Sequence, residues 1–150
     1  MATTLSTATL TVSIQETITL NGTKQGASIN AKFGKIKQVD ERIFTVPTSS
    51  ETAILNLSSS AAAGTYVTSK VRYIRFTNLD DTNFVRLTFV SGSKNRFDTK
   101  LEAGRSMIFS NASISGSAAG ASFGSFSNFT SVKATANSAA VDVGLFVATI

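Results

Sequence analysis

Carboxylates are the side chains of this sequence best suited to acid–base or metal chemistry, because its 150 residues include no histidine and no cysteine. Without histidine the commonest general base and the commonest metal ligand are missing, and Ser-His-Asp and Cys-His catalysis are excluded. Without cysteine there are no disulfides and no thiolate metal sites. The nine acids are Glu16, Asp40, Glu41, Glu51, Asp80, Asp81, Asp98, Glu102 and Asp142.

Two acid-based functions can be weighed from the spacing of these residues. A glycosidase needs two carboxylates that face each other across a cleft, whereas most of these acids fall in expected turns or on exposed faces. The run Asp80-Asp81-Thr82-Asn83 supplies oxygen ligands for Ca²⁺ but lacks the Asp-x-Asp-x-Asp-Gly spacing, so turn formation is the preferred interpretation. We predict that the chain is not an enzyme, and we assign it no catalytic, cofactor-binding or metal-ligating residue and no cofactor.

Other ligand classes are poorly served by the sequence. The run Gly116-Ser117-Ala118-Ala119-Gly120 lacks the Lys-Ser/Thr that completes a phosphate-binding loop. Two tyrosines and no tryptophan provide little surface for stacking against sugars. The net charge is +5, but the basic residues are scattered apart from Lys32, Lys35 and Lys37, whereas nucleic-acid binders concentrate charge on one face. Nucleic acid is therefore not an expected partner.

The composition predicts an all-β fold. Hydrophobic residues make up 42% of the chain and charged residues 15%, with a single proline, which suits weakly charged outer faces around a real core. Alternating segments separated by turn residues predict a single antiparallel β-sandwich domain over residues 1–150, jelly-roll-like, with about eight strands. Residues 1–8 are expected to form a flexible arm, and residues 110–124 a loop rich in Ser, Ala and Gly.

The stretch 70–109 is predicted to organise the sheet. Strands are expected at 70–78 and 84–90, rich in the β-branched and aromatic residues that fit a pleated surface. In the first strand Ile74 and Phe76 point one way and Tyr73 the other, as in a strand covered on one side and partly covered on the other. Pairing of these two strands is expected, although six turn residues are more than a tight hairpin needs. A polar loop, an Ala103-Gly104 turn and a strand at 107–109 follow.

The segment 10–20 has the cleanest alternation in the chain and predicts one long strand, bent at Gln15-Glu16 and followed by an Asn21-Gly22 turn. Two interpretations of its role are open. The preferred one places the segment in the protein's own sheet. The other has it pair with a neighbouring subunit.

Further elements follow the same reasoning. Strands are predicted at 42–47, 51–57 and 132–136, and the last strand presents Val141, Val143, Leu145 and Val147 on one face. Residues 32–39 have apolar side chains at a spacing of three, which fits either a helical turn or an irregular strand. Phe123, Phe126 and Phe129 share that spacing, so a short helix and a loop anchored by phenylalanine are both open.

The N-terminal sequence does not have the character of a signal peptide. The first basic residue is Lys24, and residues 1–20 contain no unbroken apolar run. No stretch approaches the length of a transmembrane helix. We therefore expect folding in a cytoplasm and no membrane partner.

The central stretch resembles small virion structural proteins of tailed bacteriophages, especially those of marine cyanophages. The residues that carry the likeness are Val71-x-Tyr73-Ile74-Arg75-Phe76-Thr77-Asn78-Leu79-Asp80-Asp81-Thr82-Asn83-Phe84-Val85-x-Leu87 and Leu101-x-Ala103-Gly104-x-Ser106-Met107-Ile108-Phe109. The opening residues 9–22 and the closing strands are also similar. The likeness concerns strand–turn–strand geometry, and no functional residue can be transferred with it.

The resemblance implies a β-rich particle component present in many copies. The expected function is that of a capsid decoration (cement) protein, which stabilises the shell through subunit contacts. The alternatives are a tail, neck or fibre component of the virion and a module that binds a glycan or protein on the host surface. The expected partners are other copies of the chain and other virion proteins, either major capsid or tail proteins. The expected location is the virion, assembled in the host cytoplasm.

Overall fold

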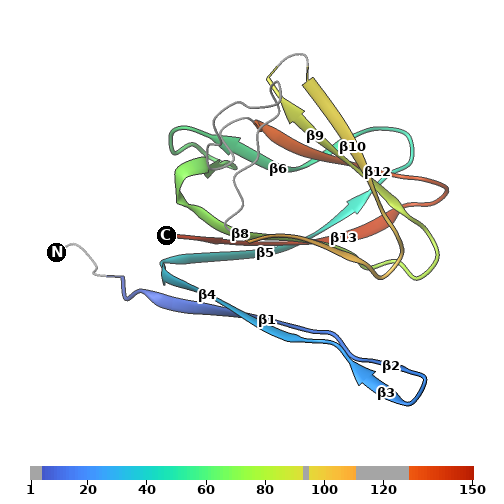
Figure 1. Ribbon diagram of the computed structural model, residues 1–150. Helices are drawn as coiled ribbons and strands as arrows, with labels where there is room; N and C mark the ends of the chain where they lie inside the picture. The colour runs from blue at the N-terminus through green and yellow to red at the C-terminus, as the bar shows by residue number, and fades with distance from the viewer. Residues whose placement is uncertain (1–4, 93–94, 111–128) are drawn as a thin grey trace.

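Two β-sheets face each other, and a long two-stranded arm projects from them (Figure 1). This computed structural model describes residues 5–92, 95–110 and 129–150. The strands are β1 (Ala8–Gln15), β2 (Ile18–Leu20), β3 (Thr23–Gln25), β4 (Ser28–Ile36), β5 (Gln38–Val46), β6 (Thr52–Ser58), β7 (Tyr66–Val67), β8 (Val71–Asn78), β9 (Val85–Ser91), β10 (Asn95–Leu101), β11 (Ser106–Ser110), β12 (Ser131–Ala136) and β13 (Val141–Thr149). A single 3₁₀ turn, η1 (Thr68–Lys70), is the only helical element of the described residues.

The predicted all-β antiparallel sandwich is confirmed. One sheet has five strands in the order β10-β9-β12-β6-β7, and the other has four in the order β11-β8-β13-β5. All neighbours are antiparallel except β6 and β7, which are parallel. The two facing sheets hold nine strands, close to the expected number of about eight, and the arm adds four strands of its own. Strand β10 lies where the sequence predicts a loop. The jelly-roll assignment stays a prediction.

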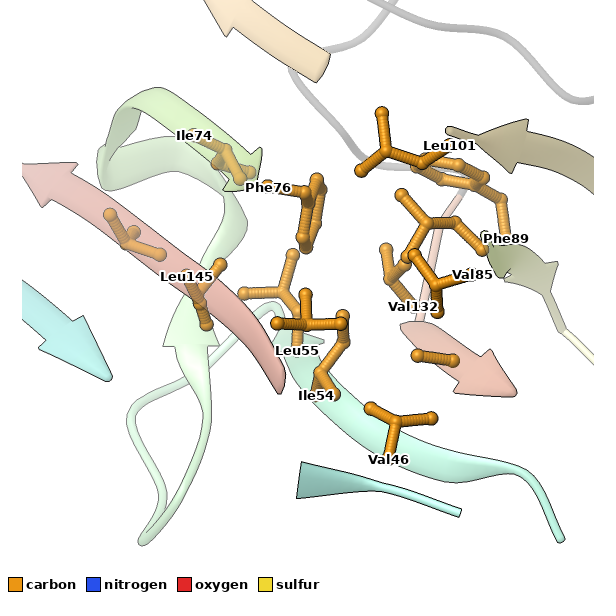
Figure 2. Close-up of a cluster of buried hydrophobic side chains, with 14 of the residues drawn as sticks. Val46, Ile54, Leu55, Ile74, Phe76, Val85, Phe89, Leu101, Val132 and Leu145 are labelled. Carbon is orange, nitrogen blue, oxygen red and sulfur yellow. The ribbon is translucent and has the colours of Figure 1, made fainter. Parts of the chain in front are cut away.

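The core lies between the two sheets and is almost entirely aliphatic and aromatic (Figure 2). Strand β13 shows how the sequence builds it. Val141, Val143, Leu145 and Val147 are each at most 2% exposed, as their alternation predicted. Across the sandwich, the rings of Phe76 and Phe89 meet edge to face with centroids 6.3 Å apart.

The expected pairing of β8 with β9 is wrong. The two strands lie in opposite sheets, so the connection between them crosses the sandwich. Buried Asn78 holds this crossing: its Nδ2 donates to the carbonyls of Asn83 (2.9 Å) and Leu101 (3.1 Å), and its Oδ1 accepts from the Asp80 N–H (3.0 Å). Strand β9 instead pairs with β10 and β12.

The arm is a hairpin of β1 and β4 that continues, after a bend, into the small hairpin of β2 and β3. The predicted bend lies at Glu16-Thr17, between β1 and β2, and the predicted Asn21-Gly22 turn has the two positive φ angles (50° and 79°) of a tight hairpin. At the bend, Gly26 has φ +132°, and a Cβ on it would lie 2.1 Å from the Glu16 carbonyl oxygen. Only glycine fits this position.

For residues 32–39 the sequence leaves a helical turn and an irregular strand open, and the structure has an irregular strand. Lys35 has φ 61°, and the pairing of β1 with β4 shifts register at this end of the arm. The bulge turns both Phe33 and Ile36 toward the same apolar cluster despite their spacing of three. Val39 belongs to β5 and is 51% exposed.

Some predicted features fall partly outside the described residues. Of the expected flexible arm, residues 5–7 precede the first strand and Ala8 begins β1. Of the expected loop 110–124, Ser110 ends β11 and the rest lies outside the described residues, as do Phe123 and Phe126. Phe129 is buried in the core. No helix in the described part of the chain is long and apolar enough to cross a membrane.

Candidate assembly surface

Most of the carboxylates singled out in the sequence are engaged with basic side chains on the surface. The ion pairs are Asp40 with Arg42 (2.8 Å), Glu41 with Arg75 (3.6 Å), Asp98 with Arg86 (3.6 Å), Glu102 with Lys100 (2.6 Å), and Glu51 with Lys133 (3.3 Å) and Arg96. In addition, Asp142 accepts a hydrogen bond from the Thr45 hydroxyl (2.7 Å). Within residues 5–92, 95–110 and 129–150, the structure gathers no group of three or more acids that could hold a metal ion.

The Asp80–Asn83 run serves as a turn. Asp80 Oδ1 accepts the backbone N–H groups of Thr82 (2.7 Å) and Asn83 (2.5 Å). The hydrogen bond from Asn83, followed by that from Thr82, lowers the pKa of the Asp80 carboxyl group. The carboxylate is thus occupied by its own backbone, in agreement with the turn interpretation.

A polar cluster joins the edges of the two sheets. The Tyr66 hydroxyl, on β7, donates to Asp40 Oδ2 on β5, and Arg42 Nη2 lies 2.8 Å from the same carboxylate oxygen. The tyrosine hydrogen bond is the main cause that lowers the pKa of Asp40. Burial, followed by that hydrogen bond and the charge of Asp40, raises the pKa of Tyr66 to about 12. The cluster fastens β7 to β5 and borders a polar recess of about 340 Å³.

The basic group noted in the sequence is only partly brought together. Lys35 and Lys37 border a shallow recess with Lys70 and the final residue, Ile150. Lys32 is not among the residues that line it and lies in the middle of β4, opposite Thr11 of β1.

The base of the arm covers part of the outer face of the four-stranded sheet. Leu10, Val12 and Phe33 of the arm pack against a cluster formed by Ile36, Tyr73 and Ala148, with Phe146 beside it. The rings of Phe33 and Tyr73 lie 5.9 Å apart, and those of Tyr73 and Phe146 lie 5.8 Å apart. This contact explains the predicted double coverage of β8, since Tyr73 faces the arm and Phe76 faces the core.

Beyond this base the arm carries large aliphatic side chains that nothing in the described structure covers. Ile14 is 45% exposed, Ile18 54%, Leu20 55% and Ile29 56%. We call these four residues the distal stripe. Ile14 and Ile29 are cross-strand partners and lie on one face, whereas Ser13 and Asn30, joined by a 2.7 Å hydrogen bond, lie on the other. The arm is therefore amphipathic along its paired length.

A groove on the outer face of the four-stranded sheet is uncovered as well. It has a volume of about 670 Å³, and we call it the outer groove; its lining residues are Glu41, Arg42, Ile43, Arg75, Thr77, Leu79, Ser106 and Gly144. Gly144 lies in register between Ile43 and Thr77, and its missing side chain lowers the floor of the groove. Ile43 is 66% exposed and Leu79 50%.

The alternation of residues 10–20 marked the apolar side of the arm, but nothing in the sequence marked the outer groove. Its lining comes from four separate segments that only the pairing of β5, β8, β11 and β13 brings together. Comparisons of the chain with protein-family models, with curated proteins and with solved structures each return no match.

Proposed function

We propose that this chain is a non-enzymatic structural subunit of a tailed-phage virion, acting as a capsid decoration (cement) protein that stabilises the shell through subunit contacts. The observation that carries the proposal is the arm with its exposed distal stripe. Contiguous exposed apolar residues on a soluble protein mark surfaces that are covered by a partner. The phage setting comes from the resemblance of residues 71–109 to virion proteins.

The geometry of the arm supports an assembly role over a purely internal one. A two-stranded hairpin is marginally stable in water unless a further layer covers it. In the described residues β1 pairs only with β4, and β4 only with β1, so both long edges offer free backbone groups. A partner that covers this arm would satisfy its edges and bury its distal stripe.

A tail, neck or fibre component is the second candidate, and the projection of the arm favours it. Figure 1 shows β2 and β3 at the end of an arm that leaves the four-stranded sheet and lies well apart from the sandwich. An arm that reaches to one side suits a ring, in which each subunit contacts the next.

Immunogold labelling of particles with an antibody to this chain tests the proposal. Label over the head supports decoration. Label confined to the tail or neck rejects decoration and favours a ring or fibre component. Absence of label from intact particles, with the protein abundant in the lysate, rejects a surface-exposed virion role and favours a host-surface binding module.

A short-arm variant provides the matched reagent for this test. Residues 16–27 are replaced by Asn-Gly, which closes a tight turn between the ladder partners Gln15 and Ser28. Particles stripped of the protein should rebind the full chain and lose most of their binding to the short-arm variant. Equal rebinding of both chains would remove the arm from the assembly contact.

A further inference from the structure

The chain carries two uncovered surfaces that expose aliphatic side chains, the distal stripe of the arm and the outer groove of the four-stranded sheet, where Ile43 and Leu79 are exposed. We infer that the distal stripe of one copy docks in the outer groove of a second copy. The inference takes its biological setting from the proposed function, because a subunit present in many copies must contact its neighbours. Beyond the proposed function, the inference specifies the contact surfaces, the residues in them and a second copy of the chain as the partner.

The contact at the base of the arm provides the template. There the apolar face of β1 and β4 already lies on the outer face of the sheet, over Tyr73 and Ala148. The outer groove continues the same face, because Gly144 and Thr77 follow along β13 and β8 on the same side. The distal stripe likewise continues the arm: Ile14 follows Val12 by two positions. A second arm on this face would extend a packing mode that the chain already uses.

The chain's own arm is held away from its groove. The arm is anchored at Ile36, which is 4% exposed, and a single residue, Lys37, joins it to β5. No residue of the arm lines the outer groove. In Figure 1 the arm diverges from the sheet of β5, β8 and β13 as it approaches β2 and β3. The occupant of the groove must then come from another molecule.

Charge and area both suit a second copy. The groove carries Glu41, Arg42 and Arg75, and the end of the arm carries Lys24 and Glu16, so each surface offers charges of both signs to the other. Four aliphatic side chains that are about half exposed present roughly 400 Å² of surface. A reciprocal dimer uses one stripe and one groove from each chain, which brings the buried area per partner near the roughly 800 Å² of a stable interface.

Sedimentation equilibrium of the purified full chain over a concentration series tests the inference. We expect the native chain to dimerise reversibly. Ile18→Asp places a charge in the stripe and Leu79→Asp places one in the groove, so each should raise the dissociation constant of the dimer at least about 100-fold. Thr19→Asp is the matched control, since it adds the same charge between two stripe residues but on the opposite face of β2. Unchanged thermal melting of the sandwich confirms that each variant is folded.

Engineered cross-linking identifies which surfaces meet, and the absence of native cysteine makes it unambiguous. Leu20→Cys and Leu79→Cys chains of different mass are mixed under mild oxidation, and we expect the mixed disulfide dimer in excess over either homodimer. With both cysteines in one chain, a predominantly intrachain disulfide would mean that the arm closes on its own groove, which would overturn the inference.

The result separates this inference from the proposed function. A chain that stays monomeric at every concentration, or a dimer equally stable in all three aspartate variants, overturns the docking inference. Gold label on particles made with such a monomeric chain would leave the virion role standing. Conversely, a stripe-dependent dimer that never labels particles would keep the docking and reject the virion role.

Discussion

The sandwich and the arm are built from the same kind of sequence, yet they place it in opposite environments. In β13 every second side chain from Val141 to Val147 is at most 2% exposed. In β2 the same alternation leaves Ile18 and Leu20 more than half exposed. The difference lies in what faces each strand: β13 has a second sheet over it, whereas β2 has only β3 beside it. Alternation thus defines the two faces of a strand, and the tertiary neighbours determine which face is buried.

The largest effect should come from a matched pair of leucine substitutions. Leu145→Ala, at a site 2% exposed, should lower the free energy of unfolding by about 2–5 kcal/mol, through lost burial and the cavity left behind. Leu20→Ala, at a site 55% exposed, should change it by less than about 0.5 kcal/mol. Urea denaturation at a concentration that keeps the chain monomeric measures both. Equal losses would mean that the distal arm is as much a part of the folded core as β13.

The second largest loss of stability should come from the connection between β8 and β9, which crosses from one sheet to the other. Asn78→Ala removes an amide that satisfies two carbonyls and accepts one N–H in a fully buried site. We expect a loss of about 2–3 kcal/mol, because buried backbone groups would be left without partners. Thr77→Ala, at the neighbouring half-buried position whose hydroxyl contacts Ser106 (2.9 Å), is the control and should cost well under half as much. A small loss of stability in both variants would mean that water takes over the hydrogen bonds that the Asn78 amide makes.

The hydrogen bond between Tyr66 and Asp40, which joins the edges of the two sheets, should contribute less to the free energy of unfolding, and its contribution should depend on pH. Tyr66→Phe removes the hydrogen bond to Asp40 and should cost about 1 kcal/mol at neutral pH. Because the folded pKa of Asp40 lies below its ordinary 3.8, this contribution is complete above pH 3.8 and is lost as pH falls through the lower folded value. Because the pKa of Tyr66 is raised from 10.0 to about 12, the native chain also loses stability as pH rises above 10.

Unfolding free energies of the native chain and Tyr66→Phe, measured from acid to alkaline pH, test this link. The difference between the two proteins should be a plateau between about pH 4 and pH 10 and should shrink on both sides. A difference that does not vary with pH would remove Asp40 as the partner. The arm contains neither residue, so its hydrogen exchange should be the same in both proteins.

Sequence reasoning succeeded where the structure depends on local pattern. The inward face of β13, the Asn21-Gly22 turn and the partial coverage of the outer face of β8 all follow from alternation and turn chemistry. It failed where distant segments meet. Strand β10 alternates Arg96, Asp98 and Lys100 along an edge, so it has the composition of a loop, and only its ladder with β9 makes it a strand.

The candidate assembly surface likewise has one part that local sequence pattern predicts and one part that it does not. The apolar face of the arm was visible in residues 10–20, but whether the sandwich covers it depends on how far the arm reaches past the sheet. The groove could not be predicted, since Gly144 and Leu79 are far apart in the sequence and meet only after β8 and β13 pair. Both misses concern non-local contacts, which single-sequence patterns do not encode.

The smallest effect on global stability should come from the bend of the arm. Gly26→Ala places a methyl group against the Glu16 carbonyl in a backbone conformation that L side chains rarely adopt, so the bend must open. The amides of β2 and β3 should then exchange with deuterium at least about tenfold faster, while the unfolding free energy of the sandwich changes by less than about 0.5 kcal/mol. Gly34→Ala, with open space around it and no positive φ, is the control and should leave exchange in β2 and β3 unchanged. If Gly26→Ala instead destabilised the sandwich as much as Leu145→Ala, the arm and the sandwich would form one cooperative unit, and the contrast between them would be one of exposure alone.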